Sequence, residues 1–139
     1  MPTVRHVATL IALDSSGRVL LQKRGAYAKR GEDVAFFGGG IEAGETPLQA
    51  LVREIREELD WDLTGEKVDP LGVFEARDPD GTPRAVRHAF VVRTDRPAES
   101  LRVLEGEGAF WSTVEAARKL KFPSDVGGVL DAAELAART

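Results

Sequence analysis

Apolar and β-branched residues recur in short runs along the first part of the chain, with turn-forming residues between the runs. Residues 4–13 form one run and residues 19–21 the next, and Asp14-Ser15-Ser16-Gly17 separates them. This order predicts a β-hairpin. A further short run at residues 34–37 leads directly into Gly38-Gly39-Gly40 and predicts another strand.

The hydrophobic period then changes to that of a helix. Thr46 has the character of an N-cap, Pro47 suits the first helical position, and Gln49 stands three residues after the cap, which is the capping-box pattern. Helical spacing also relates the apolar residues that follow, which predicts one buried face made of Leu48, Leu51, Val52, Ile55 and Leu59.

The second half of the chain alternates strands and helices. Residues 68–76 and 85–93 read as strands around a turn at Asp78-Pro79-Asp80-Gly81, so they predict a second hairpin. A loop over residues 96–107 precedes the remaining predicted elements, which are a short strand at 109–111, a short helix near 114–120 and a closing helix from about 126 to 137. No repeat or interdomain linker interrupts this order, so we expect a single domain over residues 1–139.

Composition agrees with a small globular protein. The chain has 139 residues, 42% hydrophobic and 30% charged, which suits one domain with one core. Its net charge of −4 comes from interspersed acidic and basic residues, and the absence of a basic stripe argues against duplex nucleic acid as a partner. There is no Cys, which excludes disulfides and thiolate chemistry. The longest early apolar run, residues 7–13, is too short for a membrane helix, so we expect no membrane partner and a cytoplasmic location.

Three carboxylates mark the predicted helix at residues 47–59. Glu54, Glu57 and Glu58 are spaced i, i+3 and i+4, so they should cluster on a face turned away from the apolar one. Mutually repelling carboxylates favour a divalent cation, and hard oxygen ligands favour Mg²⁺ or Mn²⁺. The glycines at 38–40 allow backbone groups to point into the same site, where a phosphate could lie. On these residues alone, a solvated acidic helix face beside a Gly-rich turn is the favoured interpretation.

The full spacing decides between the two interpretations. Gly39 is followed after five residues by Glu45, then after seven residues by Arg53-Glu54-Ile55, Glu57-Glu58, Asp60 and Trp61. This pattern resembles the Nudix box, and six specified matches arise by chance on the order of once in ten million registers. Two residues depart from the pattern: Asp60 stands where the family usually has Gly, and Phe37 stands where Pro often precedes the glycines. Asp tolerates a left-handed helix end, so we expect the turn at Asp60 to be preserved.

The resemblance implies an α/β fold, the Nudix-type α/β/α sandwich with a mixed central sheet. It also implies Mg²⁺ as cofactor, with Mn²⁺ as a substitute, held by Glu54, Glu57 and Glu58 with the carbonyl of Gly38. By the same resemblance, Arg53 would orient Glu57 or Glu58 through a bidentate hydrogen bond. Two further roles are implied for the loop before the helix: Glu45 would brace it and help hold the metal shell, and the backbone of Gly39 would approach the substrate.

Three residues outside the box are also candidates. Glu105, in the acidic loop Leu104-Glu105-Gly106-Glu107-Gly108, would act as general base or extra ligand, unless it is simply an exposed loop carboxylate. Arg24 would contact substrate phosphates or a sugar, unless it is only solvated. Asp125 precedes the last helix and is expected to cap it, with recognition of a base as the functional alternative.

The function implied is Mg²⁺-dependent cleavage of a phosphoanhydride bond in a nucleoside triphosphate or another nucleoside diphosphate derivative, with oxidised nucleotides among the candidates. One alternative is a nucleotide-sugar or ADP-ribose hydrolase. Another is a non-catalytic module that binds a nucleotide or a protein, which the intact acidic residues argue against. The expected partner is therefore a small nucleotide, and a homodimer is the default expectation for a small enzyme.

Overall fold

The computed structural model describes residues 4–139. Within them a mixed sheet has the strand order β3-β2-β1-β6-β5, and β4 pairs with β1 while β7 pairs with β2. The strands are β1 (Arg5–Leu13), β2 (Val19–Lys23), β3 (Val34–Ala35), β4 (Gly38–Gly40), β5 (Val68–Arg77), β6 (Pro83–Arg93) and β7 (Gly108–Ser112). The helices are α1 (Pro47–Leu59), α2 (Val114–Ala117) and α3 (Gly127–Ala136), with single 3₁₀ turns η1 (Gly25–Tyr27), η2 (Leu63–Gly65) and η3 (Ala98–Ser100).

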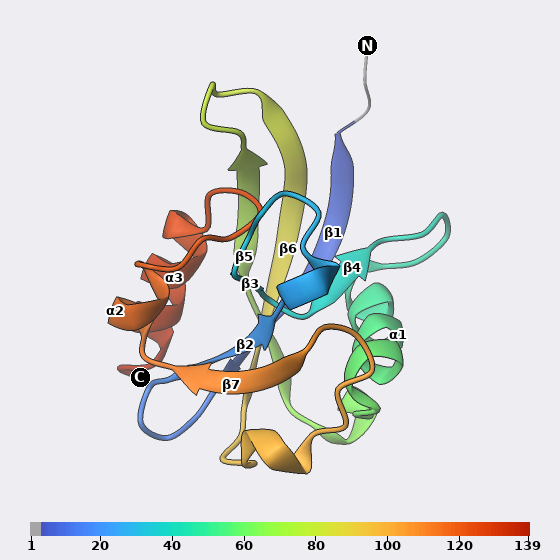
Figure 1. Ribbon diagram of the computed structural model, residues 1–139. Helices are drawn as coiled ribbons and strands as arrows, with labels where there is room; N and C mark the ends of the chain where they lie inside the picture. Colours follow the sequence, from blue (N-terminus) through green and yellow to red (C-terminus); the bar gives the residue numbers. More distant parts are fainter. Residues whose placement is uncertain (1–3) are drawn as a thin grey trace.

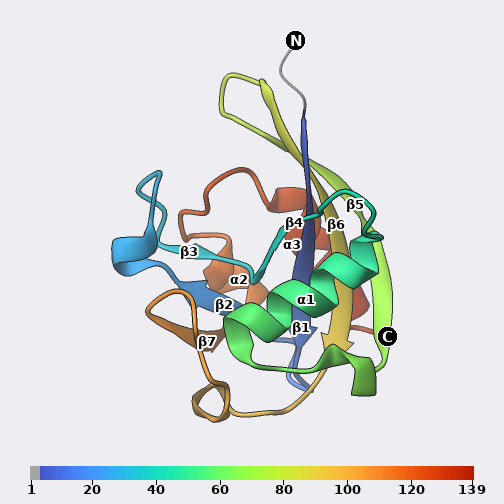
Figure 2. The ribbon, with the colours of Figure 1, turned by 90° about the vertical axis from the view of Figure 1, so that its right-hand side faces the viewer.

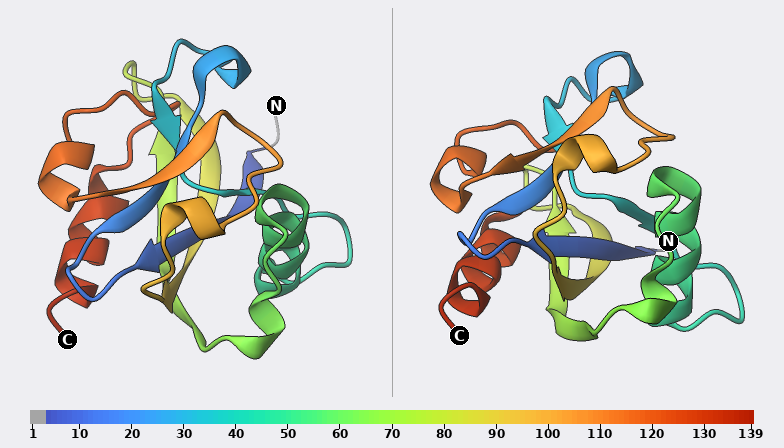
Figure 3. Two further views of the ribbon diagram at one scale, coloured as in Figure 1. Left: turned by 60° about the horizontal axis from the view of Figure 1, so that its bottom comes forward. Right: turned by 90° about the horizontal axis from the view of Figure 1, so that it is seen from below.

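Helices cover both faces of the sheet. Helix α1 lies on one side of β1, β6 and β5, and α2 and α3 lie on the other side (Figures 1 and 3). The predicted α/β/α sandwich with a mixed sheet is therefore confirmed. Among residues 4–139, no helix is long and apolar enough to cross a membrane.

Both predicted hairpins are present, and their turns form for the expected reason. Asp14 follows β1, and its carboxylate accepts from the backbone N–H groups of Ser16 and Arg18, at 3.0 and 2.8 Å, which closes the turn to β2. The β5–β6 turn closes through a bond from the Gly81 N–H to the Asp78 carbonyl. The local pattern did not predict the join between the hairpins, which is the parallel pairing of β1 with β6 from Arg5–Ala85 to Leu13–Arg93.

The three glycines at 38–40 form strand β4 instead of a turn. Gly38, Gly39 and Gly40 pair antiparallel with Thr9, Ala8 and Val7 of β1. The chain leaves β4 through the loop at residues 41–46 and enters α1 directly, as Figure 2 shows. This short path fixes the glycine backbone beside α1.

Helix α1 begins as predicted. The Thr46 hydroxyl accepts from the Gln49 N–H at 3.1 Å, and the Gln49 side chain accepts from the Thr46 N–H at 2.9 Å, so the capping box is complete. Leu51, Ile55 and Leu59 are buried. Leu48 is 42% exposed, so its predicted burial was wrong. A helical side chain leans toward the N-terminus, and in the first turn Leu48 leans past the part of the helix that the sheet covers.

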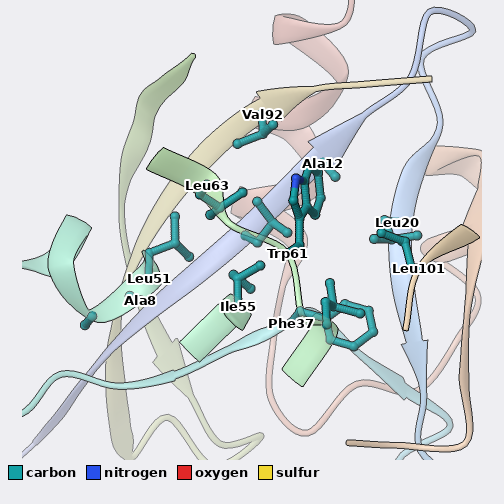
Figure 4. Packing of buried hydrophobic residues seen from close by; sticks show 13 residues of the cluster. Ala8, Ala12, Leu20, Phe37, Leu51, Ile55, Trp61, Leu63, Val92 and Leu101 are labelled. Atoms are coloured by element: carbon teal, nitrogen blue, oxygen red, sulfur yellow. The ribbon is translucent and has the colours of Figure 1, made fainter. Parts of the chain in front are cut away.

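Two separate apolar clusters hold the layers together. The cluster between α1 and the sheet packs Phe37 and Trp61 against Leu51, Ile55 and Leu63 (Figure 4). The Trp61 indole N–H donates to the Glu66 carboxylate at 3.0 Å, so its polar atom is satisfied inside the cluster. The second cluster lies on the other face, where side chains of α2 and α3 meet residues of β1, β2 and β6.

Asp60 ends α1 in the left-handed conformation, with φ 50° and ψ 36°. It is the one non-Gly residue with positive φ between residues 4 and 139. The Asp60 N–H still bonds to the Arg56 carbonyl at 3.0 Å, so the turn that Gly makes in related boxes is preserved, as predicted.

We expect Asp60→Gly to be more stable than Asp60→Ala by about 1 kcal/mol, because both variants delete the carboxylate but only Ala keeps the Cβ that disfavours this conformation. Urea unfolding of the two variants measures the difference. An Ala variant as stable as the Gly variant would contradict the assigned helix end.

Candidate active site

A pocket of about 440 Å³ opens beside α1 and collects most of the predicted site residues. Its acidic side is formed by Glu54 and Glu58 of α1 and by Glu105 from the loop before β7. The glycine backbone of β4 forms the floor next to these carboxylates. The size is within the range of small-molecule sites.

The floor of the pocket packs closely around Gly38 and Gly39. Gly38 has φ +146°, and a Cβ there would overlap the Ala8 carbonyl oxygen of β1. A Cβ on Gly39 would overlap the Glu54 carboxylate. Any larger residue at these two positions would therefore push β4 away from β1 or the carboxylate out of the pocket.

Glu58 is buried, with 5% of its surface exposed. Its carboxylate accepts from the Gly38 N–H at 2.8 Å and faces Glu105. Burial, followed by hydrogen bonding with the neighbouring Glu105, holds the pKa of Glu58 well above its usual range, although the Gly38 bond acts in the opposite direction. The prediction that all three glutamates turn away from the apolar face was therefore wrong for Glu58, which lies at the edge of that face beside Leu51.

Arg53 is the centre of a separate ion-pair network. Its guanidinium donates two bonds to Glu45, at 2.8 and 2.9 Å, one to Glu54 at 2.9 Å, and one to the Gly40 carbonyl at 3.0 Å. The predicted bidentate bond is present, but its partner is Glu45 and not Glu57 or Glu58. Arg53 thus ties the start of the loop, the acid Glu45 and the helix together, and it fixes one oxygen of Glu54.

Glu45 braces the loop at residues 41–46, as predicted. Its carboxylate accepts from the Glu42 N–H at 2.9 Å in addition to the two bonds from Arg53. These bonds lower the pKa of Glu45 to about 2, with the Arg53 hydrogen bond as the largest cause. Glu45 does not line the pocket, so a part in the metal shell remains a prediction.

Glu57 lies outside the pocket. Its side chain is 59% exposed and its closest ionic contact is Arg53 at 3.6 Å. It borders a groove on the outer side of α1 together with Leu48 and Arg56. The structure therefore brings Glu54, Glu58 and Glu105 to one pocket and leaves Glu57 at its margin.

The donor set fits a hard divalent cation. Over residues 4–139, no three His, Cys, Asp or Glu side chains are already gathered closely enough to enclose an ion. Glu58 and Glu105 nevertheless face each other with Glu54 in the same pocket, and all their donor atoms are carboxylate oxygens. Such a pair needs either a shared proton or a cation, and oxygen-only ligands favour Mg²⁺ or Mn²⁺.

The acidic loop holds Glu105 and Glu107 in different roles. The Glu105 backbone carbonyl accepts from the Gln22 side chain at 3.2 Å, which leaves its carboxylate at the pocket. The Glu107 carboxylate instead accepts from the Ala26 N–H in η1, and the Glu107 N–H bonds to the Lys23 carbonyl at 2.7 Å. Glu107 therefore links the loop before β7 to the segment around η1.

Arg24 lines the pocket, but its guanidinium already donates to three groups. These are the buried Glu32 at 3.2 Å, the Gln22 side chain and the Tyr27 carbonyl. Burial acts to raise the pKa of Glu32, but bonds from the Arg30 backbone N–H and the Arg24 guanidinium outweigh it and lower the pKa below its usual range. Contact of Arg24 with substrate remains a prediction, whereas its bonds show that it fixes the pocket wall.

Asp125 does not line this pocket. Its carboxylate accepts from the N–H of Gly127, the first residue of α3, at 2.9 Å. The N-cap of α3 is Val126, which makes no side-chain cap bond, so the expectation that Asp125 is the N-cap was wrong. The Asp125 carboxylate still accepts from the first helical N–H, from one residue before the N-cap.

The pocket is also lined by Arg87, Gln22 and Glu32, which were not predicted from the sequence. Glu32 and Gln22 carry no spacing signal, because their partner Arg24 is recognisable only after β2 and the following loop are folded. For Arg87 a signal did exist, since a charged residue interrupts the apolar run at 85–93 in a strand buried at the centre of the sheet.

Comparison with known proteins gives one family and several partial relatives. The family model described as the NUDIX domain matches residues 3–133. The chain is similar to an 8-oxo-dGTP diphosphatase of Proteus vulgaris, with 37% identity over 59 residues that cover 42% of this chain and 53% of that protein. It is also similar to the CTP pyrophosphohydrolase of Escherichia coli (strain K12), with 42% identity over 69 residues, or 49% of this chain and 50% of that protein.

Both matches span about half the length of these curated relatives. Among solved structures, the solution structure of the E. coli ORF135 protein matches with a TM-score of 0.63 and 26% identity, over 100% of this chain and 96% of that one. The likeness therefore extends to the whole fold.

We expect Glu58→Gln to melt at a higher temperature than the unmodified protein when both are metal-free at pH 8. The raised pKa means that the folded protein keeps a proton that unfolded Glu, with its ordinary pKa of 4.5, releases. Stability conferred by that proton is complete below pH 4.5 and is lost as pH rises toward the folded pKa. Gln can accept from Gly38 and donate to Glu105 at any pH. Differential scanning fluorimetry across pH 5–9 measures the effect.

The matched control is Glu57→Gln, which changes the same group on an exposed side chain of the same helix. Its metal-free melting curve should follow the unmodified protein at every pH. A Glu58→Gln protein that melts lower than the unmodified protein at pH 8 would mean that the buried carboxylate is not under electrostatic strain.

Proposed function

The chain belongs to the NUDIX domain family, and we propose that it is a pyrophosphohydrolase that cleaves a phosphoanhydride bond of a nucleotide with the help of a divalent metal. The single observation that carries the proposal is the pocket in which Glu54, Glu58 and Glu105 face the glycine backbone of β4. The two helix carboxylates would repel the negative charges of a polyphosphate. The pocket therefore suits a polyphosphate only when a cation lies between the carboxylates and the phosphates.

Hydrolases of this family generally need a divalent metal, and we propose Mg²⁺, with Mn²⁺ as a substitute, because the ligands on offer are carboxylate oxygens. Glu54 and Glu58 would hold it, with the Gly38 carbonyl and with Glu57 if that side chain turns from Arg53 toward the pocket. A bound divalent cation neutralises charge on the phosphoryl oxygens and lowers the pKa of the attacking water.

The remaining roles belong to residues of the chain. We assign Glu105 as the group that takes a proton from the attacking water, since its carboxylate borders the pocket while its backbone is held by Gln22. Arg53 is a positioning residue, because it fixes Glu54 and the Gly40 carbonyl without lining the pocket itself. Glu45 supports Arg53 from the loop.

The substrate we favour is a nucleoside triphosphate, ordinary or oxidised. The names of two relatives, an 8-oxo-dGTP diphosphatase and a CTP pyrophosphohydrolase, support this class. The pocket volume of about 440 Å³ is also of the size that holds one small ligand.

We predict that the protein releases pyrophosphate from at least one member of a panel of nucleoside triphosphates when Mg²⁺ is present, and that Glu105→Gln lowers kcat at least about tenfold with little change in KM. The reason is that Gln keeps the size and hydrogen-bonding reach of Glu but cannot take a proton. Adding 8-oxo-dGTP, a nucleotide sugar and ADP-ribose to the panel compares the three enzyme classes directly.

Glu107→Gln is the matched control, because it alters the same loop at a carboxylate that bonds only within the loops. It should keep kcat within about twofold of the unmodified enzyme. Absence of metal-dependent turnover on every compound would favour a binding module, and unchanged turnover in Glu105→Gln would remove Glu105 from the reaction.

A further inference from the structure

Gln22 is a polar side chain in the buried part of β2. It is 2% exposed, and it lines the pocket beside the carboxylates of Glu58 and Glu105. Its side-chain NH₂ group donates to the Glu105 backbone carbonyl at 3.2 Å, and its side-chain oxygen accepts from the Arg24 guanidinium. A buried amide that is bonded at both ends holds its two partners at a fixed separation.

The amide of Gln22 has one orientation that suits these partners. A carbonyl oxygen accepts hydrogen bonds and a guanidinium donates them. With the amide flipped, its oxygen would face the Glu105 carbonyl and its NH₂ group would face the N–H donors of Arg24. The Arg24 guanidinium therefore determines which end of the Gln22 amide faces Glu105.

Arg24 is itself held in place by a buried carboxylate. Its guanidinium donates to Glu32 at 3.2 Å and to the Tyr27 carbonyl at 2.7 Å, and Glu32 is 6% exposed. The Glu32 carboxylate also accepts from the Arg30 N–H at 2.9 Å. A chain of hydrogen bonds thus runs from Glu32 through Arg24 and Gln22 to the loop before β7.

The backbone around Glu105 is held on both sides. On one side the Leu104 N–H donates to the Glu58 carbonyl of α1 at 2.7 Å. On the other side Gln22 holds the Glu105 carbonyl, and the next residue is Gly106 with φ +91°. Because glycine adopts positive and negative φ about equally well, it does not by itself fix the peptide group that precedes it. The bond from Gln22 selects one orientation of that peptide.

Gly106 also packs directly against the side chain of Gln22. A Cβ on Gly106 would lie 2.6 Å from Gln22 Cγ and 2.9 Å from its Cδ. Beyond this contact, β7 pairs with β2 in the register Ala109–Gln22, and Figure 1 shows the two strands side by side. The loop and Gln22 therefore meet through packing as well as hydrogen bonding, so a shift of one moves the other.

We propose that Gln22 is a positioning residue for the reaction, because it sets the orientation of the Glu105 peptide and so aims the Glu105 carboxylate into the pocket. This inference rests on the proposed function, in which Glu105 takes a proton from the attacking water. Proton transfer requires the carboxylate to lie within hydrogen-bonding reach of that water, so a rotation of the peptide lowers the rate. Gln22 acts on the reaction only through the Glu105 backbone.

The first test is the kinetics of Gln22→Met, which keeps the length of the side chain but removes the N–H donor. We expect kcat to fall by about fivefold to tenfold, because the Glu105 carboxylate is no longer held toward the water. KM should change by less than about twofold, because the substrate does not bind to Gln22. Hydrolysis of the best nucleoside triphosphate with Mg²⁺ measures both constants.

A double-mutant cycle with Glu105→Gln tests whether Gln22 acts through Glu105. The double variant should be no slower than Glu105→Gln alone, within about twofold, because a side chain that takes no proton gains nothing from being aimed. Three results would overturn the proposal. These are losses of kcat that multiply in the double variant, an unchanged kcat in Gln22→Met, and a higher KM with unchanged kcat, which would make Gln22 a substrate contact.

Gln49→Met is the matched control, because Gln49 is the other glutamine of the chain and its side chain bonds to the Thr46 N–H at the start of α1. This variant also loses one side-chain hydrogen bond. It should melt at a lower temperature than the unmodified protein and keep kcat within about twofold.

Gln22→Glu serves as a second variant in case Gln22→Met does not fold. Its carboxylate keeps the bond from Arg24, so the buried guanidinium stays paired, but it has no N–H to donate to Glu105. The same fall in kcat and the same result in the double-mutant cycle are expected, and an unchanged kcat would overturn the proposal.

The NMR resonance of the Gly106 amide in the metal-free protein separates this inference from the proposed function. This N–H belongs to the peptide whose carbonyl accepts from Gln22, so Gln22→Met should shift or broaden its signal and Gln49→Met should not. If that change is seen but no nucleotide is hydrolysed, the orientation of the loop by Gln22 stands and the proposed hydrolysis fails. If hydrolysis proceeds and the Gly106 signal stays unchanged in Gln22→Met, the role of Gln22 alone is wrong.

Discussion

The buried carboxylate of Glu58 imposes the strongest constraint on this site. A carboxyl group that is 5% exposed needs either a proton or a compensating charge, and Glu58 has one backbone N–H from Gly38 and a second carboxylate, Glu105, beside it. One N–H from Gly38 is not enough to stabilise a full negative charge, and the Glu105 carboxylate makes burial of that charge more unfavourable. A divalent cation resolves both conditions, and this is why the acidic pocket is better explained as a place for a metal than as a solvated helix face.

Two features hold the carboxylates in position. One is the short chain segment between β4 and α1, and the other is a single arginine. Strand β4 passes so close to β1 that glycine is required at position 38, and the loop that follows returns the chain into α1 within six residues, 41–46. Arg53 then bridges Glu45, Glu54 and the Gly40 carbonyl. The site is therefore assembled from neighbouring segments of sequence, with Glu105 as the main contribution from a distant one.

This locality explains how much the sequence could predict. The capping box at Thr46, the extent of α1 and the left-handed end at Asp60 depend on residues a few positions apart, and all three were predicted from the pattern. The partner of Arg53 was assigned wrongly, because Glu45, Glu54 and Glu57 are all within its reach and only the path of the loop selects Glu45. Glu58 is buried and Leu48 is exposed because of how far the sheet extends along the helix. The periodicity of apolar residues in the sequence gives no information about that extent. The parallel pairing of β1 with β6, which brings Arg87 into the pocket, joins segments about 80 residues apart and has no local signal.

The most direct measurement is the anomalous scattering of a crystal soaked in Mn²⁺. We predict an anomalous peak in the pocket within bonding distance, about 2.2 Å, of carboxylate oxygens of Glu54 and Glu58, and loss of that peak in crystals of Glu58→Gln. Two results would contradict the claim that the buried carboxylate is a metal ligand. One is a peak elsewhere on the molecule with Glu58 and Glu105 still in contact, and the other is an unchanged peak in the variant.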